Sequence, residues 1–129
     1  MTPAGLDTRR RALGLSVEEL AEICGVQDRT ARRWMSGDNA IPKDVVQTLE
    51  ALEERMDNAV DQMVALVQAT AAAGQPVILW RYRSQDDLER SRHAAGLPLG
   101  AHAMMIAWAS DALGAEDIDV EIRWGRNGS

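Results

Sequence analysis

The chain has 129 residues, of which 46% are hydrophobic, and a formal net charge of -6 at pH 7. A chain of this length can bury one compact core with an appendage, and it contains no run of about 18 uncharged apolar residues that could span a membrane. Its one cysteine, Cys24, excludes an internal disulfide and a cysteine-based metal site. We therefore expect a cytoplasmic protein.

The charge is unevenly distributed along the chain. Residues 1–43 hold seven basic and six acidic residues, whereas residues 44–129 hold seven basic and fourteen acidic ones. The acidic excess therefore lies in the C-terminal part and leaves the N-terminal part suited to nucleic acid. Its light positive charge predicts that firm DNA binding needs two copies of the chain, because a unit with few phosphate contacts binds weakly at physiological salt.

Two short helices joined by a glycine turn are predicted over residues 15–37. Ser16 precedes an apolar-periodic run and Glu19 follows three residues later, a pattern typical of a capping box at the start of a helix. Gly25 is placed to end that helix in the left-handed conformation. The spacing of these signals predicts a helix-turn-helix.

The second of these helices, over residues 27–36, has two faces. Gln27 and Asp28 can open it, because an acceptor side chain and a negative charge suit the free amides of a helix start. Ala31 and Trp34 recur at helical spacing with Met35 and predict a packed face. The opposite face carries arginines, whose planar forks can pair with guanine or clamp a phosphate. The alternative is an ordinary solvated basic face.

The residues predicted to contact DNA lie on this helix and shortly before it. They are Gln27, Asp28, Arg29, Thr30, Arg32, Arg33 and Ser36, together with Ser16, Arg10 and Arg11. Arg10 and Arg11 belong to a basic cluster that also includes Arg9 and is expected on a helix that crosses the phosphate backbone.

These residues resemble a known family. The segment 15–26, followed by Thr30, Trp34 and Gly37, resembles the helix-turn-helix of phage-repressor-like regulators of the Cro/repressor or Xre-like type. The continuation over residues 37–45 (GDNAIPKDV) and the layout of the rest of the chain are similar to the anti-CRISPR-associated autorepressors of the second class.

The resemblance implies a homodimer that binds an inverted-repeat operator through the recognition helix and represses its own operon. The positions that carry over are the arginines at 29, 32 and 33, with residues 27, 28 and 30 at their margin. Val17 stands where a glutamine is frequent and Met35 where a glutamate is frequent. The first departure removes a side chain that could touch the DNA backbone.

A long helix is predicted from Pro42, because the chain then shows no glycine or proline until Gly74. Its apolar residues fall at steps of four and three from Val45 to Val67, a heptad-like seam. Such a seam packs either on its own chain or on a partner's helix, and its length favours a dimer. The predicted dimer contacts are Leu52, Met56, Val60, Met63, Val67, Trp80 and Trp124.

The tail, residues 74–129, is predicted to alternate strands and helices. A strand over 77–82 is apolar on both faces and is expected to be covered on both sides. A helix follows from Ser84 or Asp86 to about Ala95, then a nearly apolar helix over 101–113 that Gly114 stops. Residues 118–124 alternate strictly, as in a half-buried strand. Two strands are marginal alone and could pair across a dimer.

The expected fold is therefore mainly α with a small α+β tail. It comprises an N-terminal helix-turn-helix bundle with the long helix, residues 1–73, and a C-terminal strand-helix-helix-strand dimerisation module, residues 74–129. The tail offers carboxylates and two imidazoles, His93 and His102, but their spacing fits neither a catalytic site nor a metal site. We expect no enzyme activity and no cofactor.

The sequence thus predicts a homodimeric transcriptional repressor that binds double-stranded DNA. One alternative is an antitoxin-like or phage assembly protein, whose tail binds another protein and whose helix-turn-helix anchors it to DNA. RNA binding by the same basic face is a further alternative that the sequence leaves open.

Overall fold

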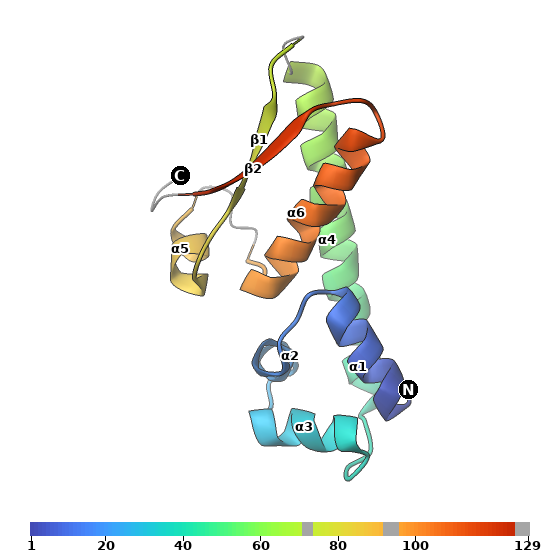
Figure 1. Cartoon of the computed structure of the whole chain (residues 1–129). Coiled ribbons are helices and arrows are strands. Elements are labelled where there is room, and N and C mark those ends of the chain that lie inside the picture. Colours follow the sequence, from blue (N-terminus) through green and yellow to red (C-terminus); the bar gives the residue numbers. More distant parts are fainter. Residues whose placement is uncertain (71–73, 92–95, 126–129) are drawn as a thin grey trace. The chain divides into compact units, whose positions relative to one another are not determined.

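The computed structural model describes residues 1–70, 74–91 and 96–125. It is mainly helical, with two strands in the C-terminal part, which confirms the expected fold class (Figure 1). The elements in chain order are α1 (Pro3–Ala12), α2 (Val17–Cys24), α3 (Asp28–Ser36), α4 (Lys43–Thr70), β1 (Val77–Arg81), α5 (Gln85–Arg90), α6 (Leu99–Gly114) and β2 (Val120–Trp124).

The chain divides into two compact units, Met1–Arg55 and Met56–Ser129. The division falls inside α4, so the second half of this continuous helix belongs with the tail. The sequence instead placed the whole long helix with the helix-turn-helix. The functional boundary after residue 73 stays a prediction.

The start and end of α2 follow the sequence signals. The Ser16 hydroxyl accepts a hydrogen bond from the Glu19 amide at 3.0 Å, and the Glu19 carboxylate accepts one from the Ser16 amide at 2.9 Å. Gly25 is left-handed with φ 68°, and the Val26 amide donates to the Ala21 carbonyl at 3.0 Å. Both the predicted capping box and the predicted glycine stop are confirmed.

The start of α3 differs in one respect from the prediction. Asp28 lies in its first turn as expected, but the side chain of Gln27 makes no capping hydrogen bond. The helix begins there without a side-chain acceptor, because the longer glutamine side chain is a weaker local cap than serine or asparagine.

The core of the first unit is built from apolar residues of α1 to α4. Leu6, Leu20, Trp34 and Leu49 are among the side chains with almost no exposed surface. Burial of each such side chain contributes on the order of 2 kcal/mol. The same core includes Leu13, Leu15, Ala21, Ala31, Val45 and Leu52. This packing fixes which face of α3 points away from the protein.

The second unit contains a parallel sheet of two strands against α6. The two strands lie side by side (Figure 1). They pair in register from Val77 opposite Val120 to Arg81 opposite Trp124. Helix α6 packs against both strands and buries Met105, Ile106 and further residues, so it contributes much of the core of this unit. Because β1 and β2 run parallel, the connection between them contains both α5 and α6.

The tail follows its expectations only in part. In β1 Leu79 is buried and the other four residues are half-buried, so neither face of this strand is fully exposed. Helix α5 ends at Arg90, because Ser91 turns extended, and the expected end near residue 95 lies outside the described residues. The expectation for β2 is wrong, because this strand is not half-buried: Ile122 is 46% and Trp124 45% exposed.

The apolar seam of α4 packs largely on its own chain. Leu52, Met56 and Val60 are buried within the single chain, so they offer no free surface for a partner. Met63 and Val67 are half-buried and line, with β1 and α6, a cavity of about 410 Å³. Trp80 of β1 lines the same cavity. Of the residues predicted to contact a partner, Trp124 is the most exposed.

His102 is a packed residue of α6. It is 2% exposed, and its ring lies beside that of Tyr82 with 5.8 Å between ring centroids. This position is that of a packed core side chain. His93 lies outside the described residues. Within the described ranges, no helix combines the length and the apolar character needed to cross a bilayer.

We predict that Ser16→Ala destabilises the protein by about 1 kcal/mol, because it removes the acceptor that caps α2. Urea unfolding followed by circular dichroism measures the change. Thr48→Ala is the matched control, since the Thr48 hydroxyl only donates to the Asp44 carbonyl within α4. Equal free energies of unfolding for Ser16→Ala and the wild type would contradict a stabilising cap.

Candidate nucleic-acid interface

The outer face of α3 carries three arginines. Arg29, Arg32 and Arg33 are exposed, whereas Ala31 and Trp34 on the opposite face are buried. The predicted division of this helix into a packed and a free face is therefore present in the structure. Met35 is half-buried at the boundary between the two faces.

The carboxyl end of α3 is held by local contacts. Gly37 is left-handed with φ 86°, and the Asn39 amide donates to the Arg33 carbonyl at 3.2 Å. The Ser36 hydroxyl lies 3.2 Å from the Arg33 carbonyl and 3.0 Å from an Asp38 carboxylate oxygen. These contacts occupy Ser36 at the end of the helix.

The three arginines of α3 are not equivalent. Arg32 donates to the carboxylate of Glu18 on α2 at 2.8 Å, and both side chains are 58% exposed. The pKa of Glu18 is lowered, first by a hydrogen bond from its own backbone amide and further by the positive charge of Arg32. Within the described part of the chain, Arg29 and Arg33 have no ion pair. They therefore carry the uncompensated positive charge of this face.

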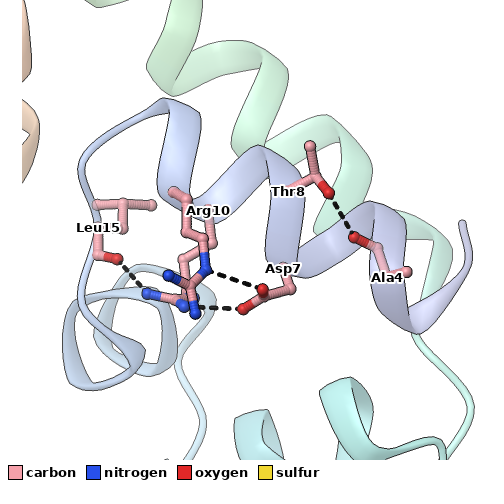
Figure 2. Close-up of polar contacts among 6 residues, drawn as sticks. Ala4, Asp7, Thr8, Arg10 and Leu15 are labelled. Carbon is pink, nitrogen blue, oxygen red and sulfur yellow. Dashed lines mark hydrogen bonds and ion pairs between the residues drawn. The ribbon is translucent and has the colours of Figure 1, made fainter.

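The basic cluster of α1 is tied to acidic neighbours. Figure 2 shows the Arg10 side chain between Asp7 and Leu15: it donates to the Asp7 carboxylate and to the Leu15 carbonyl, each at 2.7 Å. The Arg10 side chain is only 12% exposed. Arg10 therefore fastens the turn between α1 and α2 and presents little charge to a ligand.

The other two arginines of α1 are more open. Arg11 donates to the second oxygen of Asp7 at 2.9 Å, but its side chain remains 71% exposed. Arg9 lies 3.3 Å from Glu53 of α4 in an ion pair. Arg11 is thus the member of the cluster that could still reach a phosphate.

The remaining predicted contacts lie at the amino ends of α2 and α3. Gln27 and Asp28 are exposed, and Thr30 is half-buried. Ser16 is also half-buried, and its hydroxyl is used by the cap of α2.

Sequence reasoning missed two acidic residues that shape this surface. Asp7 could have been found, because its spacing of three and four residues from Arg10 and Arg11 is the spacing of helical ion pairs. Glu18 had no such signal, since it meets Arg32 across two different helices.

Cys24, at the end of α2, is only partly exposed. Burial raises the pKa of its thiol, and the negative charge of Asp44 raises it further. The thiol is therefore protonated at neutral pH, which disfavours a nucleophilic role.

We predict that Asp7→Asn makes the protein less stable at neutral pH and less sensitive to acid. Hydrogen bonds from Arg10, then from Arg11, hold the pKa of Asp7 below its ordinary value of 3.8. The pKa of Asp7 is lower in the folded than in the unfolded protein. The ionised carboxylate therefore stabilises the fold above about pH 4, and this stabilisation is lost as the pH falls through the pKa of the folded protein.

The melting temperature, measured from pH 7 to pH 3, tests this. The difference between wild type and Asp7→Asn should shrink as the pH falls. Asp57→Asn, at an exposed position of α4, is the control and should follow the wild type throughout. A constant difference between wild type and Asp7→Asn over the whole range would refute the role of the carboxylate.

Comparison with known proteins agrees with this geometry. Residues 6–52 match the helix-turn-helix family model, so the match spans α2 and α3 and extends into α1 and α4. No curated protein matches the chain. Domains of this kind bind DNA and are typical of regulators that are not enzymes. The chain thus contains an Xre-type helix-turn-helix domain at residues 6–52.

Proposed function

We propose that the protein is a sequence-specific transcriptional repressor that binds an inverted-repeat operator as a homodimer. The observation that carries this proposal is the exposed arginine face of α3 within a helix-turn-helix domain. In such domains the second helix lies in the major groove, and residues near its amino end contact the base edges.

Each side chain on this face has a defined chemical use. Arg29 and Arg33 lie one helical turn apart, so that both can reach the same groove and pair with guanine O6 and N7 or clamp a phosphate. Gln27 can pair with adenine and Asp28 can accept from the amino group of cytosine. Arg32 can also contact DNA once its ion pair with Glu18 breaks, because an exposed ion pair of this kind is worth at most about 1 kcal/mol.

The same surface favours duplex DNA over duplex RNA. An α-helix fits the wide major groove of B-DNA, whereas the major groove of A-form RNA is too deep and narrow for side chains to read. RNA loops are bound by stacking their bases on aromatic side chains or on guanidinium planes, and the exposed face of α3 offers arginines but no aromatic side chain.

The distribution of charge supports the need for two copies. Arg9, Arg10, Arg11 and Arg32 are each paired with a carboxylate of the first unit, so few cations remain for phosphates. Two such units on one operator would add their contacts. Because the Arg11 side chain remains 71% exposed in its ion pair and that of Arg10 only 12%, we include Arg11 with the α3 residues in the proposed DNA surface and leave Arg10 out.

Repression of its own operon, as in the anti-CRISPR-associated autorepressors, is the finer part of the proposal. It rests on the resemblance of residues 37–45 and of the chain layout. Purified protein that shifts the promoter of its own gene, and blocks transcription from that promoter, would support this part.

We predict that Arg29→Ala combined with Arg33→Ala weakens binding to the selected operator by at least about 30-fold, because each base contact supplies about 1–3 kcal/mol. Fluorescence anisotropy with labelled duplex DNA measures the affinity at one fixed salt concentration.

Arg55→Ala combined with Arg90→Ala is the matched control. Both arginines are exposed and lie outside the helix-turn-helix, and this variant changes the net charge by the same amount. Equal losses of affinity in the two double variants would show a general charge effect. That result would contradict the proposal that α3 reads the bases.

A further inference from the structure

Strand β2 leaves apolar side chains uncovered. Ile122 is 46% and Trp124 45% exposed, and they alternate with Glu121 and Arg123. The strand has β1 on one side, and no described strand lies on the other. An open edge with apolar side chains is a template for further strand pairing.

The backbone of β2 shows which residues face this open edge. The Val77 amide donates to the Asp119 carbonyl at 2.9 Å, and the Gly125 amide donates to the Arg81 carbonyl at 2.7 Å. The odd-numbered residues therefore direct their backbone groups to β1, since these groups alternate along a parallel strand. Val120, Ile122 and Trp124 consequently direct theirs to the open edge.

We propose that this edge pairs antiparallel with β2 of a second copy, centred on Ile122. The pairing rests on the homodimer of the proposed function and locates its interface. It would join the two sheets into one of four strands. Ile122 would then contact the partner's Ile122, and Trp124 would contact the partner's Val120. The apolar seam of α4 is a weaker candidate for the dimer interface, because its residues Met63 and Val67 line a cavity within their own unit.

The charges of β2 select this register. With Ile122 opposite the partner's Ile122, Val120 faces the partner's Trp124, and Glu121 faces the partner's Arg123. A centre on Glu121 would oppose two glutamates, and a centre on Arg123 would oppose two arginines. Opposite charges on facing residues stabilise an antiparallel pair, and like charges destabilise it.

The geometry of the ladder strengthens this selection. Because Ile122 directs its backbone groups outward, it would form a hydrogen-bonded pair with the partner's Ile122. Glu121 and the partner's Arg123 then form a non-hydrogen-bonded pair, in which the side chains lie closer together. Within one chain Arg123 already donates to Glu121 at 2.7 Å, so the two side chains lie on one face of the strand.

Trp124 is held for such a contact by two arginines. The guanidinium carbon of Arg83 lies 4.3 Å from the Trp124 ring centroid, and that of Arg81 lies 5.0 Å from it. Both are cation–π contacts, which restrict the ring before a partner binds.

Charge exchange tests the register in the full-length protein. Glu121→Arg gives a strand with two arginines, and Arg123→Glu gives one with two glutamates. Each single variant should raise the dimer dissociation constant about tenfold or more, because both facing pairs become repulsive. The double variant, Glu121→Arg with Arg123→Glu, keeps both attractions and the composition of the wild type, so it should dimerise like the wild type.

An equimolar mixture of the two single variants provides the decisive measurement. Sedimentation velocity should show a 14.1 kDa monomer for each variant alone and a dimer for the mixture, since all facing pairs are then of opposite charge. Restored association also shows that both variants are folded.

Two results would overturn the register: dimerisation of each single variant as strong as that of the wild type, or a mixture that stays monomeric. A monomeric wild type would overturn the interface together with the homodimer. The DNA-reading role of α3 would still stand or fall separately, by the loss of binding in the Arg29 and Arg33 variant.

Discussion

The left-handed turn at Gly25 is the constraint on which the rest of the DNA surface depends. It ends α2 and redirects the chain, so that α3 starts three residues later with its apolar face toward the core. A residue with a Cβ would pay about 1–2 kcal/mol to adopt φ 68°. Trp34 and Ala31 then hold α3 by burial, and this burial leaves the arginines outside.

Ion pairs divide the arginines of the first unit into structural and free ones. Arg10 fastens the turn between α1 and α2, and Arg32 links α3 to α2. Arg29 and Arg33 keep their charge available on the exposed face of α3. A small domain with few free cations gains most from a second copy, because contacts to one operator then add. The small number of free cations in the first unit is thus a reason for the dimer that we propose to form at the open edge of the second unit.

Local signals explain what could be predicted from the sequence. The limits of α2 depend on Ser16, Glu19 and Gly25, which act within a few residues of each other, and the structure confirms them. The pairing of Arg32 with Glu18 and the exposure of Ile122 depend on contacts between distant segments. Alternation along β2 predicted a covered face, but it could not show that the cover is missing within one chain.

Selection of bound sequences from a random pool of duplex DNA tests the central claim most directly. The claim is that two α3 helices read one operator, each in its own major groove. The account predicts enrichment of an inverted repeat whose half-sites are about 10–10.5 base pairs apart, or a multiple of this, because two-fold related helices enter successive grooves on one face of DNA. Enrichment of a single unrepeated site, or no enrichment at all, would contradict it.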